Sequence, residues 1–186
     1  MSIINIRGTS GSGKSTIARM VMEHPSYGPR EAHYIEGRKR PLYYTLAGQR
    51  PLAVLGHYET ACGGCDTIPK MDTIFQLARE LHDSGHDVLM EGLLMAADVQ
   101  RHAALAQEGY PLLVVALDEP LDVCLASVNN RRHARNPDLP PVNPKNTTSK
   151  HRGVMLSVGR LKDAGVRVVV SDREGALSRV LTELEL

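Results

Sequence analysis

Short apolar runs alternate along the chain with longer stretches in which apolar residues recur every three or four positions. The runs are rich in leucine and β-branched side chains, which is typical of buried strands, and they cover residues 3–6, 42–46, 52–55, 87–90, 112–117 and 166–170. The helical spacing predicts helices around residues 17–21, 74–81, 99–106, 121–128, 149–161 and 177–184. We therefore expect a three-layer α/β fold, with about five parallel strands and helices on both faces of the sheet.

Two segments depart from this alternation. Only Ala-Gly-Gln-Arg-Pro separates the runs 42–46 and 52–55, which predicts two short strands joined by a tight turn. The segment 24–40 is polar and interrupted by prolines and glycines, so we expect it to be irregular. It ends in three consecutive cations, Arg38-Lys39-Arg40.

Length and composition narrow the class of protein. A chain of 186 residues, 42% of them hydrophobic, suits one compact domain over residues 1–186. The 22 Lys and Arg residues nearly balance 21 Asp and Glu residues, which argues against a tight non-specific nucleic-acid binder but allows a local basic patch. Three cysteines without a signal peptide predict a reducing cytoplasm, and the apolar runs are too short to span a membrane.

The glycine-rich segment after the first apolar run has the pattern G-x-x-x-x-G-K-S between a predicted strand and a predicted helix. In that context the backbone amides cradle phosphate, Lys14 reaches the β- and γ-phosphates, and the Ser15 hydroxyl coordinates Mg²⁺. The pattern predicts a nucleoside triphosphate site, but it does not indicate which reaction or movement the triphosphate drives. The predicted nucleotide-binding residues here are Gly8, Ser10, Gly11, Ser12, Gly13, Lys14, Ser15 and Thr16.

Further candidates follow from the rule that parallel sheets bind ligands beyond the carboxyl ends of their strands. Glu91 ends an apolar run and is predicted to hold Mg²⁺ or its water, together with Ser15. Asp66 is our first choice for the base that takes the proton of an acceptor hydroxyl, and Glu59 is the second. An alternative role for Asp66 is to cap the next helix. The same rule collects Asp118 and Asp172 as well.

Three arginines continue the helical stripe of residues 121–128, namely Arg131, Arg132 and Arg135. Phosphoryl transfer needs positive charge over the transferring group, so Arg131 and Arg135 are predicted to be catalytic, with Arg131 also binding the nucleotide. The alternative is an exposed helix end whose cations complement its dipole.

Among phosphate-loop proteins, the chain lacks the Asn-Lys-x-Asp guanine motif of GTPases and is short for a mechanical ATPase. The class that remains is a small kinase.

The chain resembles nucleoside-monophosphate-kinase-like P-loop kinases in its glycine-rich loop, in the strand that ends at Asp118, and in the three arginines that follow residue 128. This resemblance implies a lid at about residues 131–149. The segments 7–16, 56–66, 87–92 and 142–147 further resemble bacteriophage-encoded kinases, some of them described as 5-hydroxymethyluracil DNA kinases. This resemblance implies ATP and Mg²⁺ as cofactors. It also implies the hydroxymethyl group of a DNA base as acceptor, in thymine hypermodification in the host cytoplasm.

The acceptor side of such a kinase is predicted to include His57, Tyr58, Glu59 and Arg38. The Cys62-x-x-Cys65 spacing is open to three interpretations: a zinc site, a redox pair, or reduced thiols in a Gly-Gly loop that shapes the acceptor pocket. Two other functions also stay open. One is a kinase of a free nucleotide or small hydroxylated metabolite, and the other is a nucleotide-dependent binding module without phosphoryl transfer.

Overall fold

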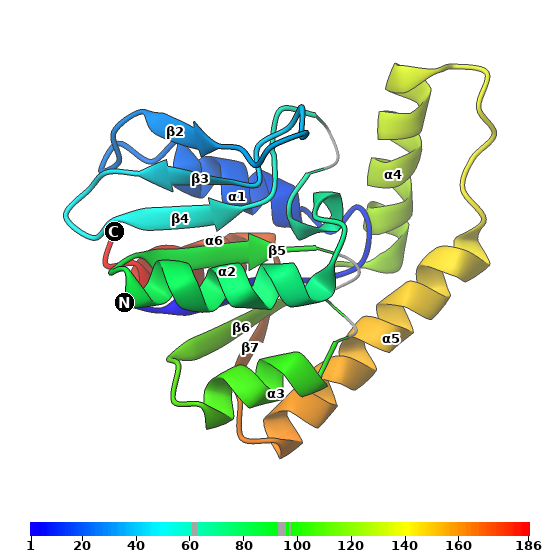
Figure 1. Ribbon diagram of the computed structural model, residues 1–186. Helices are drawn as coiled ribbons and strands as arrows, with labels where there is room; N and C mark the ends of the chain where they lie inside the picture. Colours follow the sequence, from blue (N-terminus) through cyan, green and yellow to red (C-terminus); the bar gives the residue numbers. More distant parts are fainter. Residues whose placement is uncertain (61–62, 93–95, 97) are drawn as a thin grey trace.

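A computed structural model describes residues 1–60, 63–92, 96 and 98–186 of the protein. A seven-stranded sheet lies at its centre, in the order β2-β3-β4-β5-β1-β6-β7 (Figure 1). The strands are β1 (Ile3–Arg7), β2 (Arg30–His33), β3 (Tyr43–Leu46), β4 (Leu52–Leu55), β5 (Asp87–Glu91), β6 (Leu112–Leu117) and β7 (Arg167–Ser171). The helices are α1 (Lys14–Met22), α2 (Met71–Asp83), α3 (Gln100–Gln107), α4 (Leu121–Arg135), α5 (Pro144–Asp163) and α6 (Arg173–Glu183), with a 3₁₀ turn, η1, at Cys65–Thr67.

Five of the strands run parallel to one another, namely β4, β5, β1, β6 and β7. This confirms the predicted α/β class and its parallel sheet. The strands β3 and β4 form the predicted antiparallel pair. The expectation of an irregular segment 24–40 is wrong for Arg30–His33, which pairs with β3 as an additional edge strand. Three of its four residues are polar and none is fully buried, so no apolar pattern marked the strand.

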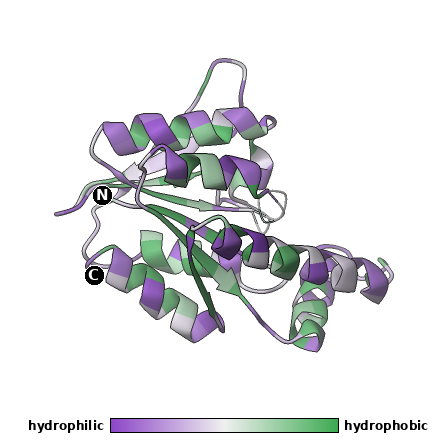
Figure 2. Ribbon diagram, turned by 90° about the horizontal axis from the view of Figure 1, so that it is seen from below, coloured by the Kyte–Doolittle hydropathy of each residue, from purple (hydrophilic) through white to green (hydrophobic). Residues whose placement is uncertain are grey.

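The sheet is covered on both faces because successive strand side chains point to opposite sides. Ile3 packs into a core under α2, α3 and α5, whereas Ile4 and Ile6 pack against α1 and α6. In Figure 1 the first group of helices lies in front of the sheet and the second behind it. Figure 2 shows the apolar strands between helices whose outer faces are hydrophilic. The three predicted layers are therefore present.

The segment predicted as a lid, residues 131–149, joins two helices that extend beyond the sheet (Figure 1). It comprises the last turn of α4, a connection over residues 136–143, and the start of α5. The helix α5 begins five residues before the predicted position 149, because Asn143 caps it and Pro144 occupies its first position. The Asn143 side chain accepts a hydrogen bond from the Lys145 amide at 3.0 Å.

The carboxyl ends of the five parallel strands meet at one edge of the sheet, which determines where a ligand site can form. The phosphate loop and the segment before α2 lie at this edge, and α4 rises beside them, whereas the two chain termini lie at the opposite edge (Figure 1). None of the helices in the described part of the chain combines the length and apolar character needed to cross a lipid bilayer.

Candidate active site

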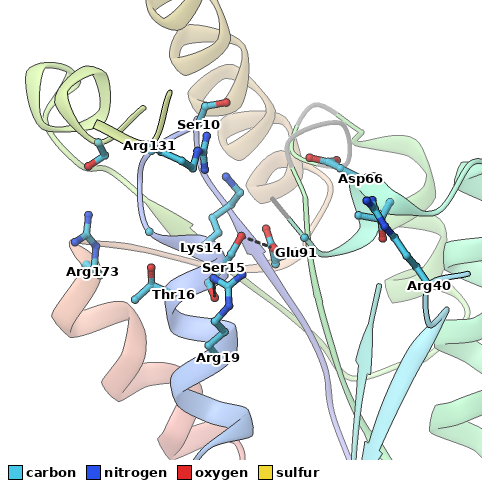
Figure 3. A pocket seen from close by; sticks show the side chains of 15 residues that line it. Ser10, Lys14, Ser15, Thr16, Arg19, Arg40, Asp66, Glu91, Arg131 and Arg173 are labelled. Carbon is cyan, nitrogen blue, oxygen red and sulfur yellow. Dashed lines mark hydrogen bonds between the residues drawn. The ribbon is translucent and has the colours of Figure 1, made fainter. Parts of the chain in front are cut away.

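A cavity of about 570 Å³ opens at the carboxyl edge of the sheet. Side chains from α1, α4, the β2–β3 loop, η1 and the end of β5 surround it (Figure 3). It is lined by Ser10, Gly11, Gly13, Lys14, Ser15, Thr16, Arg19, Arg40, Gly63, Asp66, Thr67, Glu91, Ser127, Arg131 and Arg173. Residues predicted separately for nucleotide, metal and proton transfer thus share one cavity.

The phosphate loop forms one wall of this cavity. Gly11 has a φ of 85°, and a β-carbon there would overlap the backbone carbonyl of Cys124 on α4, so this position requires glycine. The loop leads directly into α1, whose N-terminal residues Lys14, Ser15 and Thr16 line the cavity, so the positive end of the helix dipole favours an anionic phosphate there. Of the predicted nucleotide-binding residues, Gly8 and Ser12 do not line the cavity, whereas the other six do.

Lys14 lies at the base of the cavity and is only 7% exposed. Its ammonium nitrogen donates a hydrogen bond to the carbonyl oxygen of Thr9 at 3.0 Å. Burial lowers the pKa of Lys14, and the nearby carboxylates of Glu91 and Asp66 oppose that shift. The lysine is therefore a partly desolvated cation, and a desolvated cation attracts an incoming phosphate more strongly than one in water.

Ser15 and Glu91 form a hydroxyl–carboxylate pair beside Lys14. The Ser15 hydroxyl donates to Glu91 Oε1 at 2.7 Å (Figure 3). Burial raises the pKa of Glu91, while the Lys14 charge and the Ser15 hydrogen bond lower it. Within the described residues no group of three His, Cys, Asp or Glu side chains could hold a metal ion. This pair nevertheless suits Mg²⁺, which takes few protein ligands and completes its shell with water and phosphate oxygens.

Asp66 stands on the opposite wall of the cavity, in η1 rather than at the start of α2 (Figure 3). Its carboxylate lies against Gly92, directly after Glu91, where a β-carbon would come within 2.8 Å of Asp66 Oδ1. The neighbouring Gly64 has a φ of 72° and packs so closely on Glu91 that a β-carbon would overlap its carboxylate. The Gly-Gly pair between the cysteines therefore allows Asp66 to approach the phosphate loop.

The residues predicted for the acceptor side do not themselves line the cavity. His57 and Tyr58 are buried, and the Glu59 carboxylate accepts a hydrogen bond from the Tyr44 hydroxyl at 2.8 Å. Arg38 also lies outside the lining residues, and its Nη2 donates to the Thr67 carbonyl at 2.8 Å.

His57 nevertheless contacts a cavity residue that our sequence interpretation did not select, Arg40. The Nη1 atom of Arg40 lies 3.2 Å from His57 Nε2. Burial lowers the pKa of His57, and the Arg40 charge lowers it further, so the imidazole is neutral and accepts this hydrogen bond. His57 thus orients an arginine that faces the cavity.

The two arginines predicted to be catalytic, Arg131 and Arg135, differ in position. Arg131 lines the cavity together with Ser127, one turn earlier on α4, and its charge acts on the pKa of Lys14. Arg135 is exposed one turn further along α4 and is not a lining residue.

Two other cavity arginines, Arg19 and Arg173, were missed from the sequence. Arg19 lies one turn after Ser15 on α1 and donates to the carbonyl oxygens of Tyr58, at 3.4 Å, and Thr60, at 2.6 Å. Arg173 Nε donates to the Ser12 carbonyl at 3.3 Å. Two signals in the sequence could have identified them. Arg19 lies four residues after Ser15, and therefore on the same side of the helix, and Arg173 lies just beyond the end of strand β7.

The remaining candidates have other surroundings. Cys65 is a buried free thiol in the core under α2, whereas Cys62 lies outside the described residues, so the three interpretations of the pair stay predictions. Asp172 caps α6 by accepting a hydrogen bond from the Gly175 amide at 2.9 Å. Asp118 lies 3.7 Å from the imidazole of His151. Neither aspartate lines the cavity.

Comparison with known proteins relates the chain to phage enzymes. It is 51% identical over 185 residues to the 5-hmdU DNA kinase of Pseudomonas phage PaMx11, and the alignment covers 98% of this chain and 97% of that protein. It is 29% identical over 188 residues to the 5-hmdU DNA kinase of Delftia phage PhiW-14, with 92% of this chain and 68% of that protein covered. Identity of this extent over the full chain establishes a family relationship.

Structural comparison bears on the fold alone. A chain from the PezAT chromosomal toxin–antitoxin system of Streptococcus pneumoniae aligns with a TM-score of 0.54 at 16% identity, covering 93% of this chain and 69% of that chain. No family model matches the chain. The α/β architecture therefore has a solved counterpart, and the kinship with the phage proteins rests on sequence.

Proposed function

The chain belongs to the 5-hmdU DNA kinase family, and we propose that it transfers the γ-phosphate of ATP to the hydroxymethyl group of 5-hydroxymethyluracil in DNA. The single observation that carries this proposal is the cavity in which the phosphate-loop residue Lys14 and the carboxylate of Asp66 stand on opposite walls. A donor site alone would suit any nucleotide-binding module. The Asp66 carboxylate faces the donor site, and this arrangement favours a kinase whose acceptor hydroxyl binds between Asp66 and the γ-phosphate.

The donor half of the proposed reaction uses the phosphate loop. Its backbone amides and the N-terminus of α1 bind the β- and γ-phosphates, and Lys14 moves from the Thr9 carbonyl to the phosphate oxygens. Ser15 and Glu91 would hold Mg²⁺, which would neutralise charge on those phosphates. Arg131 approaches from α4 and stabilises the charge of the transferring phosphoryl group.

The acceptor half centres on Asp66. Its carboxylate accepts the proton of the hydroxymethyl group while the hydroxyl oxygen forms a bond to the γ-phosphorus. The bond between the γ-phosphorus and its bridging oxygen breaks, and ADP leaves with the electron pair. The products are ADP and a phosphomethyl base in DNA, and the proton passes from Asp66 to water. Because the related kinases come from phages, we expect this reaction in the host cytoplasm.

A transfer assay with γ-labelled ATP tests this proposal. The acceptors are DNA that contains 5-hydroxymethyluracil, the same DNA with thymine, and the free hydroxymethylated nucleotide. We expect label only in the first, because thymine lacks the hydroxyl and the free nucleotide lacks the flanking DNA. Efficient labelling of the free nucleotide with inert DNA would instead identify a small-metabolite kinase. Nucleotide binding without labelling of any acceptor would identify a binding module.

A further inference from the structure

The loop between β2 and β3 presents an exposed apolar pair beside a group of cations. Tyr34 is 57% exposed and Ile35 is 49% exposed. Among the residues that the structure describes, they are the only large exposed apolar side chains adjacent in sequence. The loop continues as Glu36-Gly-Arg-Lys-Arg40, with one carboxylate and three cations. A paired apolar surface with a net positive charge suits a polyanion that exposes flat apolar groups, such as a nucleic acid.

This loop is anchored to the rim of the cavity. Its own Arg40 lines the cavity, and Arg38 Nη2 donates to the carbonyl oxygen of Thr67, another lining residue, at 2.8 Å. The base of the loop is closed by a hydrogen bond from the Leu42 amide to the His33 carbonyl at 2.7 Å. The exposed pair is therefore held next to the opening through which an acceptor enters.

The turn that presents the pair has a defined conformation. The Arg38 amide donates to the Ile35 carbonyl at 3.1 Å, which closes a four-residue β-turn. Gly37 occupies its third position with a φ of 78°, as a type II turn requires. A closed turn with its exposed side chains already in place loses little conformational entropy on binding, so Tyr34 and Ile35 are better prepared to insert into a partner than residues of an unstructured tail.

The cavity is so deep that a base stacked in a duplex could not reach the phosphate loop. Lys14, which is 7% exposed, marks the place that the γ-phosphate reaches, so the acceptor oxygen has to come close to it. A hydroxymethyl group on a base stacked in duplex DNA lies in the major groove, out of reach of a recessed site. The base has to leave the stack, and extrusion costs unstacking and unpairing energy.

We infer that Tyr34 and Ile35 form a wedge that enters duplex DNA and fills the gap left by the extruded 5-hydroxymethyluracil. Lys39 and Arg40 bind the flanking phosphates, so the wedge and the cavity act on neighbouring nucleotides. This inference rests on the proposed function and specifies its partner as a duplex that the enzyme opens itself. Apolar side chains inserted between base steps are an established way to hold distorted DNA.

The test uses a double variant, Tyr34→Ala with Ile35→Ala, and two DNA substrates. In one, 5-hydroxymethyluracil is paired in a duplex, and in the other it lies in an unpaired bulge. We expect kcat/KM to fall by about 10-fold to 100-fold on the paired substrate and much less on the bulged one, because stacking losses matter only where the gap has to be filled. Tyr34→Phe should retain activity, because the ring stacks without its hydroxyl.

A fluorescent reporter separates base extrusion from binding. With 2-aminopurine next to the modified base, wild-type protein should raise the fluorescence of the duplex, whereas the double variant should not. Leu156→Ala is the matched control, because Leu156 is also 57% exposed but lies on α5, away from the loop. Equal losses on both substrates, or unchanged extrusion in the double variant, would overturn the wedge. Wild-type protein inactive on both substrates would instead contradict the proposed function.

Discussion

The two walls of the cavity are built in opposite ways. The donor wall comes mainly from one continuous segment, the phosphate loop and the first turn of α1, in which glycines and Lys14 follow a fixed spacing. The acceptor wall is assembled from separate segments: Arg40 from the β2–β3 loop, and Asp66 and Thr67 from η1. A triphosphate site can therefore be predicted from local sequence, whereas an acceptor site depends on long-range packing.

The chemistry of the two partners explains this difference. All nucleoside triphosphates present the same phosphates, so one backbone cradle serves all of them. An acceptor differs in shape, charge and place of its hydroxyl, so its wall has to be specific to each kinase. Proposed roles on the donor wall are therefore general, and roles on the acceptor wall determine the substrate.

The largest effect should come from the donor wall. Lys14→Ala should lower turnover by about 10³-fold or more, since a charge aimed at the transition state is lost. The fold should persist, because the variant removes a buried cation rather than a packed apolar side chain. Turnover and thermal unfolding measured together check this, with Lys162→Ala as a control for loss of a lysine, because Lys162 is exposed on α5 and does not line the cavity. Wild-type turnover in Lys14→Ala would remove the basis of the donor assignment.

Asp66→Asn should lower turnover by about 10²-fold to 10⁴-fold with nearly unchanged affinity for ATP, since it keeps the shape and removes the base. Steady-state kinetics with ATP and modified DNA measure both quantities. Glu59→Gln is the matched control, because Glu59 is held by the Tyr44 hydroxyl outside the cavity. If Glu59→Gln shows the loss and Asp66→Asn does not, the two roles are exchanged.

The arginines at the end of α4 test how far the donor wall extends along that helix. Arg131→Ala should lower turnover by about 10-fold to 100-fold and weaken ATP binding less, because its charge meets the transferring group. The structure separates it from Arg135, so Arg135→Ala should have a smaller effect than Arg131→Ala, although the sequence predicted the same role for both. Equal losses confined to ATP binding would make Arg131 an ordinary nucleotide contact.

The smallest effect should come from Arg40 on the acceptor wall and from His57, which holds it. Arg40→Ala should raise the KM for DNA by about 3-fold to 10-fold, the order expected for one ordinary hydrogen bond, and leave the KM for ATP unchanged. His57→Ala should act in the same direction, because it releases Arg40. In a double-mutant cycle the two losses should not add. Additive losses would show that His57 acts independently of Arg40.

Much of the fold follows from the sequence, because apolar runs and helical spacings report burial directly. The five parallel strands and the hairpin at residues 42–55 were predicted for that reason. The edge strand β2 escaped prediction because Arg30–His33 buries little, and pairing with β3 rather than burial keeps it extended. The earlier start of α5 was marked by the Asn143–Pro144 cap, a signal that apolar spacing does not contain.

The acceptor wall was less predictable for a physical reason. The strand-end rule placed residues near the correct edge, but it cannot distinguish a side chain that faces the cavity from one that faces the core. His57 and Asp66 both follow β4, yet His57 is buried and Asp66 lines the cavity. That difference arises from the close contact of Gly64 with Glu91, which depends on tertiary packing.

The most direct test of the central claim uses a circular single-stranded DNA that contains 5-hydroxymethyluracil at known positions. Such a molecule has no ends, so only the base hydroxymethyl groups offer an acceptor hydroxyl. With γ-labelled ATP, we expect label in proportion to the number of modified bases, and none in the same circle made with thymine. Label confined to linear DNA, or equal label in the thymine circle, would contradict transfer to the base.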